Sequence, residues 1–182
     1  MAFRVETVST QQAALKRIAE LIAKGSIDPT VRRAAKAITR GVPARNDLAE
    51  LQALYNAVKT GTPNVAGLSK GMRYVSDPTA ADFFQGAKAS LEECAAGACA
   101  GDCDDQAILI GSLAAALGFT VGARAYAQAG SRSFSHVYAV AAVPKHGPWP
   151  KNYAGHGLDT TVPKASVGWD PPGGSILTYW VE

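Results

Sequence analysis

The chain has 182 residues, of which 47% are hydrophobic and 18% are charged, and its formal net charge is +3. This length and composition predict one domain over residues 1–182 with a substantial core, consisting of a helical N-terminal part (1–61) and a core (62–182). Basic residues are scattered, which favours solvated helix surfaces over a nucleic-acid interface. No signal peptide is visible, and the apolar segment 107–117 is too short to span a bilayer. We therefore expect a cytoplasmic protein that binds neither nucleic acid nor membrane.

The first third of the chain predicts three helices, each with a capping residue at its start and a glycine at its end. These helices are expected from Ser9 or Thr10 to Gly25, from Asp28 to Gly41, and from Asn46 or Asp47 to Gly61. In each of them apolar side chains recur at helical spacing. Their apolar faces are expected to pack against each other or against the rest of the domain.

The middle of the chain is less regular until it reaches an apolar segment. A short extended piece is expected over 73–78, a short helix over 80–93, and a loop of small residues over 95–101. Residues 107–117 (AILIGSLAAAL) then contain a single polar side chain, Ser112. Such a composition predicts a buried helix, and Gly118 is expected to end it.

Four strands are predicted after this helix. Residues 119–128 alternate in polarity, which indicates a half-buried strand, whereas 134–143 are apolar on both faces except at Ser135 and His136, which indicates a central strand. Two shorter strands are expected over 157–162 and 175–181. The order of elements predicts an α+β fold in which a buried helix packs on a small antiparallel sheet, preceded by the N-terminal helices.

The segment Gly101-Asp102-Cys103-Asp104-Asp105 places one cysteine at the start of the buried helix. Unpaired backbone N–H groups and the positive end of the helix dipole favour a thiolate there, although the neighbouring carboxylates oppose it. His136 is the candidate base, and Asp159 is the candidate residue that orients it. The backbone N–H of Cys103 is a natural first donor to an oxyanion.

Other roles for the histidines and cysteines remain open. His156 is a rival base, and His146 lies in a Gly/Pro-rich loop typical of a surface. Cys94, Cys99 and Cys103 raise the possibility of a zinc site with a histidine, but their spacing lacks paired C-x-x-C units. Cys94 and Cys99 could instead form a local disulfide or remain spare thiols. We expect neither a metal nor a cofactor.

The order Cys, His, Asp and the motifs around these residues resemble the transglutaminase-like superfamily of papain-like cysteine enzymes, and in particular its small bacterial and prophage members. The similar motifs are Tyr74-Val75-Ser76-Asp77, Gly101-Asp102-Cys103-Asp104-Asp105, Gly118-Phe119, Phe134-Ser135-His136-Val137-Tyr138 and Leu158-Asp159-Thr160-Thr161. The resemblance implies a papain-like core with a Cys103–His136–Asp159 triad, the cysteine on a helix N-terminus and its two partners on adjacent strands.

The resemblance also implies acyl transfer at a peptide or carboxamide bond through a thioester, with a protein or peptide as substrate. Residues 91–100 depart from the family pattern and carry two additional cysteines. This departure leaves the second oxyanion donor open, and Tyr74 and Gln85 are its candidates. The alternative hypothesis is a phage- or assembly-related structural or binding protein, associated with a virion, in which the triad is vestigial.

Overall fold

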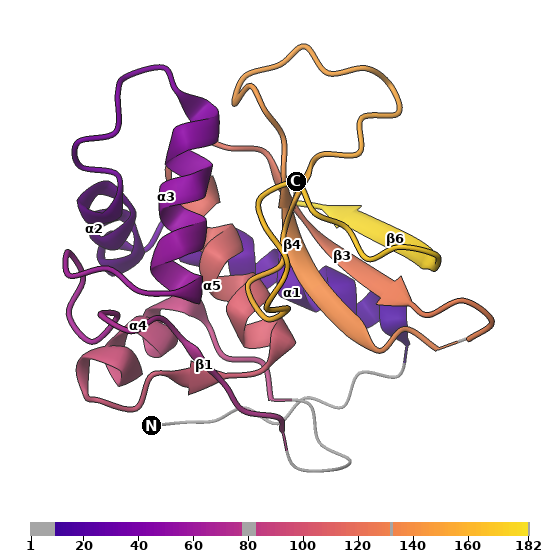
Figure 1. Ribbon diagram of the computed structural model, residues 1–182, viewed down its shortest axis with the longest axis horizontal. Helices are drawn as coiled ribbons and strands as arrows, with labels where there is room; N and C mark the ends of the chain where they lie inside the picture. The colour runs from indigo at the N-terminus through magenta and orange to yellow at the C-terminus, as the bar shows by residue number, and fades with distance from the viewer. Residues whose placement is uncertain (1–9, 78–82, 132, 182) are drawn as a thin grey trace.

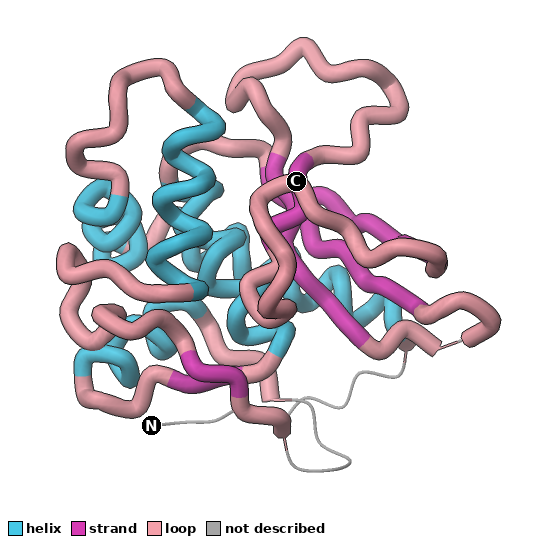
Figure 2. Tube along the Cα trace, in the orientation of Figure 1, coloured by secondary structure: helices cyan, strands magenta, loops and turns pink. Residues whose placement is uncertain are grey.

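The computed structural model describes residues 10–77, 83–131 and 133–181 as a mixed α+β fold (Figure 1). Most of the helices gather on one side of the molecule and the larger sheet on the other, while the first helix runs behind that sheet (Figure 2). The helices of the described residues are α1 (Gln11–Ser26), α2 (Pro29–Ile38), α3 (Asp47–Lys59), α4 (Ala87–Ala95) and α5 (Cys103–Ala116). The strands are β1 (Arg73–Tyr74), β2 (Ala100–Gly101), β3 (Val121–Ala127), β4 (His136–Ala141), β5 (His156–Leu158) and β6 (Ser175–Trp180).

The N-terminal helices begin at capping side chains, as predicted. Thr10, Asp28 and Asn46 each accept a hydrogen bond from a backbone N–H of the first turn, which satisfies a donor that the helix itself cannot pair. Pro29 occupies the first position of α2, where its missing N–H costs nothing. The local sequence therefore sets where these helices start.

Strand β3, predicted to be half-buried, is buried on both faces because β4 and β6 flank it and helices pack against it. Three further elements differ from the prediction in their bounds or type. Helix α4 begins at Ala87 rather than near residue 80, and residues 80–82 lie outside the described part of the chain. Ala100 and Gly101, expected in a loop, form β2 and pair in parallel with β1. Strand β5 ends at Leu158, so Asp159 follows this strand instead of lying within it. Tertiary contacts determine where these elements begin and end. A short strand in particular is formed only by pairing with its neighbour.

The four-stranded sheet has the order β5-β4-β3-β6, and all its neighbours are antiparallel. Strand β4 lies between β5 and β3, which confirms the prediction of a central strand. Leu158 pairs with Ala139 and His156 pairs with Ala141, so the residue after β5 lies toward the start of β4. This register brings Asp159 into the neighbourhood of His136.

Helix α5 forms the centre of the core, and it packs against the other four helices and against β3 and β4. Its residues from Asp104 to Ala114 are buried. The apolar composition predicts this for 107–114, whereas the polar residues 104–106 are buried without such a signal and 115–117 are only partly buried. The single polar side chain of its apolar segment, Ser112, donates a hydrogen bond to the Ile22 carbonyl of α1 at 3.4 Å. A side chain on Gly25 would collide with Ser112, so this glycine, buried inside α1, allows the two helices to approach closely.

Candidate active site

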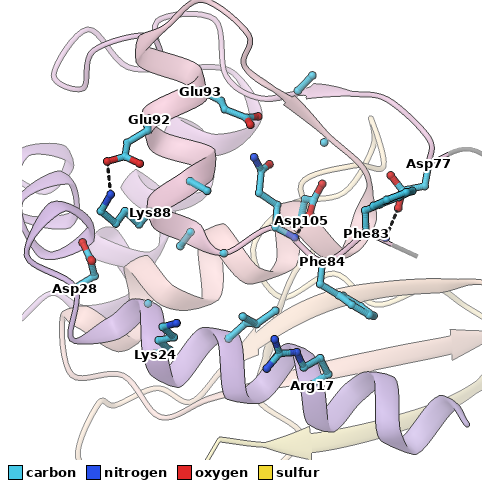
Figure 3. A pocket seen from close by; sticks show the side chains of 18 of the residues that line it. Arg17, Lys24, Asp28, Asp77, Phe83, Phe84, Lys88, Glu92, Glu93 and Asp105 are labelled. Carbon is cyan, nitrogen blue, oxygen red and sulfur yellow. Dashed lines mark hydrogen bonds and ion pairs between the residues drawn. The ribbon is translucent and has the colours of Figure 1, made fainter. Parts of the chain in front are cut away.

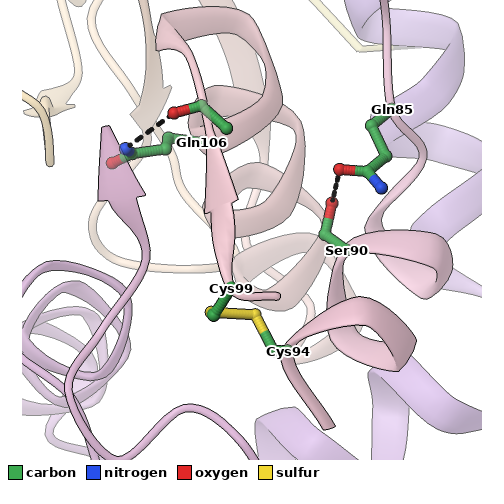
Figure 4. Close-up of a disulfide and its surroundings, with 6 residues drawn as sticks. Gln85, Ser90, Cys94, Cys99 and Gln106 are labelled. Carbon is green, nitrogen blue, oxygen red and sulfur yellow. Dashed lines mark hydrogen bonds between the residues drawn. A yellow bond between two sulfur atoms is a disulfide. The ribbon is translucent and has the colours of Figure 1, made fainter. Parts of the chain in front are cut away.

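Cys103 is the first residue of α5, and local hydrogen bonds fix the position of its backbone. The side chain of Asp102 caps the helix and accepts hydrogen bonds from the N–H groups of Asp104 and Asp105. Gly101 has no room for a Cβ, which would lie 2.4 Å from the Met72 side chain. Cys103 is the free cysteine of the chain, because Cys94 and Cys99 form a disulfide (Figure 4).

His136 and Asp159 are in direct contact. The Nε2 atom of His136 donates a hydrogen bond to Oδ2 of Asp159 at 2.7 Å, and Asp159 is completely buried. The other carboxylate oxygen accepts hydrogen bonds from the Thr161 N–H, the Thr161 hydroxyl and the Val162 N–H. Burial favours the neutral acid, but the hydrogen bond and charge of His136, together with Thr161, outweigh it and lower the pKa of Asp159. Asp159 is therefore an ionised acceptor that leaves Nδ1 as the imidazole nitrogen for another partner.

A second contact holds the other side of the imidazole. The rings of His136 and Tyr138 stack with their centroids 5.8 Å apart. The Tyr138 hydroxyl donates to Asp170 at 2.8 Å, and the buried Arg124 forms an ion pair with the same carboxylate at 2.7 Å. The orientation of His136 therefore depends on two separate groups of residues, one at the Asp159 segment and one on β3 and β4.

The thiol of Cys103 lies against the beginning of β4. The backbone N–H of Val137, the residue after His136, is directed to this thiol and lowers its pKa. His136, the predicted base, is hydrogen-bonded to the Asp159 carboxylate and precedes Val137, whose N–H faces the thiol. The imidazole and the thiol are not hydrogen-bonded to each other in the described part of the chain.

The expectation that the helix N-terminus favours a thiolate is wrong for this geometry. Burial is the largest effect and raises the pKa of the Cys103 thiol to about 12, and the charges of Asp102 and Asp104 raise it further, while the Val137 N–H lowers it. Desolvation and two nearby carboxyl groups therefore exceed the favourable effect of the helix dipole. The thiol is protonated at neutral pH, so attack on a carbonyl would require a base.

The pKa values of the two carboxyl groups that follow Cys103 are also raised. Burial raises the pKa of Asp104 to about 10, with further contributions from a hydrogen bond to Asp102 and from the charges of Asp102, Asp105 and Asp77. Burial likewise raises the pKa of Asp105 to about 7. Oxygens of Asp102, Asp104 and Asp105 lie within 4.8 Å of one another, and among the described residues they are the group that could hold a metal ion. Oxygen donors of this kind suit a hard cation.

Replacing Asp104 with asparagine should stabilise the protein, and the gain should grow with pH. Folded Asp104 retains its proton up to a pKa of about 10, whereas an unfolded aspartate ionises near pH 3.9. Wild-type stability therefore falls as the pH rises between these values, and asparagine, which cannot ionise, avoids that loss. We expect a gain of about 1 kcal/mol or more near neutral pH in urea unfolding. A variant less stable than wild type at pH 8 would mean that the carboxylate is ionised in the fold.

The two candidates for a second oxyanion donor lie in different surroundings. Tyr74 is half exposed on β1, where it pairs with Gly101 in register. The Gln85 side chain accepts a hydrogen bond from Ser90 at 3.3 Å (Figure 4). The backbone N–H of Gln85 donates to Asp105 at 2.8 Å. The Val137 N–H, which the sequence did not indicate, acts on the thiol together with the N–H of Cys103 itself, and both lower the pKa of the thiol. A backbone donor carries no signal in the residue type, so the sequence could not have identified it.

The remaining histidines and cysteines lie in other places. His156 pairs with Ala141, at the opposite end of β4 from His136. His146 approaches Gly118, just beyond the C-terminal end of α5, whereas Cys103 is at the N-terminal end. The disulfide uses two of the three sulfur atoms that the zinc hypothesis requires. It also joins the end of α4 to the segment that leads into β2, and such bonds persist in oxidising environments.

A cavity of about 920 Å³ lies beside the candidate site, among α1, α4 and the start of α5 (Figure 3). Arg17 and Lys24 line it from α1, and Phe84 lines it from the segment before α4. Gly101 and Asp105 form part of its wall, but Cys103 is not among the described residues that line it. The cavity therefore reaches the flank of the segment that carries the thiol without opening onto the sulfur.

No helix within residues 10–77, 83–131 and 133–181 combines the length and apolar character needed to cross a bilayer. Comparisons of the chain with family models, with curated proteins and with solved structures find no match. The arrangement of Cys103, His136 and Asp159 is therefore the observation on which a functional hypothesis has to depend.

Proposed function

We propose that the protein is a cysteine hydrolase or acyl transferase with a papain-like core of the transglutaminase-like type, acting on peptide or carboxamide bonds. The observation that carries this proposal is the hydrogen bond between His136 and the buried, ionised Asp159, next to the strand residue whose N–H contacts the Cys103 thiol. A carboxylate that fixes one imidazole nitrogen makes the other a base for a neighbouring thiol.

In the proposed reaction, His136 acts as a general base during attack, because the thiol is protonated at rest. Nδ1 takes the proton of Cys103 as the S–C bond forms to the substrate carbonyl. The backbone N–H of Cys103 stabilises the resulting oxyanion. The C–N bond then breaks, His136 returns the proton to the leaving amine or ammonia, and a thioester remains. Water or an amine attacks the thioester, which releases the acid or a new amide and restores the thiol.

A second candidate function is binding without catalysis, in a phage- or assembly-related protein with a vestigial triad. Two observations favour it: the pKa of the Cys103 thiol is raised, and no hydrogen bond joins this thiol to His136 within the described residues. Geometry in a free enzyme is often looser than in its complex with substrate, so these observations do not oppose catalysis by themselves.

Trapping with hydroxylamine separates the two functions. The protein is incubated with a mixture of glutamine-containing peptides and hydroxylamine, and mass spectrometry follows the products. An enzyme that acts through a thioester produces hydroxamates, and the leaving group, ammonia or a peptide amine, identifies the bond attacked. Cys103→Ala should produce none while its circular dichroism and thermal unfolding match the wild type. Peptides that bind equally to both proteins without any product would support the binding function.

A further inference from the structure

The segment that follows β5, residues 159–165, is attached to α3 by two side chains. The hydroxyl of Tyr55 hydrogen-bonds to the carbonyl oxygens of Asp159 at 2.8 Å and of Ala165 at 2.7 Å. The Nζ atom of Lys59 donates to the carbonyls of Val162 at 2.8 Å and of Ala165 at 2.7 Å. Lys59 also donates to the Tyr55 hydroxyl at 2.8 Å, so the two side chains act as one group.

These bonds fix the backbone of the segment at both ends. Tyr55 contacts the backbone of Asp159 itself, whose side chain is the partner of His136. More than 100 residues separate Tyr55 from Asp159 in the chain, and Tyr55 is only 3% exposed. A hydrogen bond to a buried carbonyl is costly to lose, because the acceptor is left without a partner. The position of the Asp159 backbone therefore depends on helix α3.

Burial and the charge of Asp159 act on the pKa of both donors. Burial, followed by the charge of Asp159, raises the pKa of Tyr55, so its hydroxyl keeps its proton. Burial lowers the pKa of Lys59, whereas the charge of Asp159 acts in the opposite direction. The charge of the Asp159 carboxylate thus acts on the pKa of both Tyr55 and Lys59, which lie close to it.

Building on the proposed function, we propose that Tyr55 and Lys59 are positioning residues that hold Asp159 where it fixes the tautomer and direction of the His136 imidazole. Neither residue contacts the thiol or is required to contact a substrate. Their effect passes from the 159–165 backbone to the Asp159 carboxylate and from there to Nε2. The helical N-terminal part of the chain thereby contributes to the site, although it supplies none of the three triad residues.

Two variants test this inference. Tyr55→Phe removes one hydroxyl and preserves the ring, and Lys59→Met removes the cation while preserving an apolar side chain of similar length. Nitrogen NMR of the imidazole rings reports the tautomer of His136, which is tractable because the chain has 3 histidines. In the wild type, neutral His136 should carry its proton on Nε2. Each variant should show a mixture of tautomers and about a tenfold slower labelling of Cys103 by iodoacetamide.

Controls are available for both changes. The lysine control is Lys88→Met, which removes a cation paired with Glu92 on the surface of α4. Because Tyr126 lies opposite His136 in the β3–β4 register, Tyr153→Phe, which removes a hydroxyl that donates to the Val143 carbonyl at 3.2 Å beyond the far end of β4, is the tyrosine control of choice. Tyr153→Phe and Lys88→Met should keep the wild-type tautomer and the wild-type labelling rate. Thermal unfolding of all four variants identifies any that fails to fold, and Lys59→Met remains informative if the buried Tyr55→Phe does not fold.

The outcomes separate this inference from the function on which it depends. Folded Tyr55→Phe and Lys59→Met proteins with the wild-type tautomer and the wild-type labelling rate would overturn the positioning role. If His136→Ala labels at the wild-type rate, the proposed function fails, but the tautomer measurement still decides whether α3 positions Asp159. A shifted tautomer in both variants, with unchanged controls, supports the inference.

Discussion

Replacing His136 with alanine should slow the labelling of Cys103 by iodoacetamide near neutral pH by about 100-fold. A thiol with a pKa of about 12 is ionised in only about one molecule in 10⁵ near pH 7, so it reacts slowly unless a neighbouring base accepts its proton. In the proposed function His136 is that base, since Asp159 occupies Nε2 and leaves Nδ1 free of that bond. Mass spectrometry can follow the labelling without ambiguity, because Cys103 is the free cysteine.

The matched control for this prediction is His156→Ala, since His156 lies at the far end of β4 from His136. This variant should label at the wild-type rate, which would also eliminate the rival base. Equal labelling of wild type, His136→Ala and His156→Ala would show that no histidine activates the thiol. That result would favour the binding function over catalysis.

Replacing Asp159 with alanine should lower the free energy of unfolding by about 3 kcal/mol at neutral pH. The fully buried carboxylate accepts hydrogen bonds from His136, Thr161 and Val162, and alanine leaves these donors without their partner. Urea unfolding at neutral pH measures the loss. A variant as stable as the wild type would mean that water or another side chain replaces the carboxylate.

The pH dependence provides a second measurement on the same variant. The pKa of Asp159 is lowered in the folded protein, so its ionised form contributes stability above about pH 3.9, the pKa of an unfolded aspartate. This contribution is lost as the pH falls through the lower pKa of the folded state. The difference in stability between wild type and Asp159→Ala should therefore shrink on acidification below about pH 4. A difference that stays constant there would show that the charge of Asp159 is unimportant for folding.

The local sequence was sufficient to predict most helices and strands. Caps at Asp28 and Asn46, the apolar segment that forms α5, and the apolar pattern of β4 are all properties of neighbouring residues. The position of Cys103 at the start of α5 follows from the same kind of signal, because Asp102 caps the helix through its own side chain. Such features depend on hydrogen bonds and periodicity within a few residues, which a sequence displays directly.

Strand β2 and the end of β5 were not predictable to the same degree, since a two-residue strand is defined by its partner rather than by its own residues. The same limitation applies to the chemistry. The sequence indicates a thiol favoured by a helix dipole, but the tertiary structure buries it beside Asp102 and Asp104 and raises its pKa. Desolvation depends on everything that packs around a group, so composition cannot reveal it.

The sequence by itself determined the α+β class, the capped helices and the residues that could form a nucleophile, a base and an orienting carboxylate. Only the tertiary structure decided that His136 and Asp159 meet, that the Val137 N–H reaches the thiol, and that Tyr55 and Lys59 hold the segment carrying Asp159. The physical reason is sequence distance. These contacts join residues brought together by the pairing of β4 with β5, by the packing of α5 against β4, and by the contact of α3 with residues 159–165, and no local pattern encodes them.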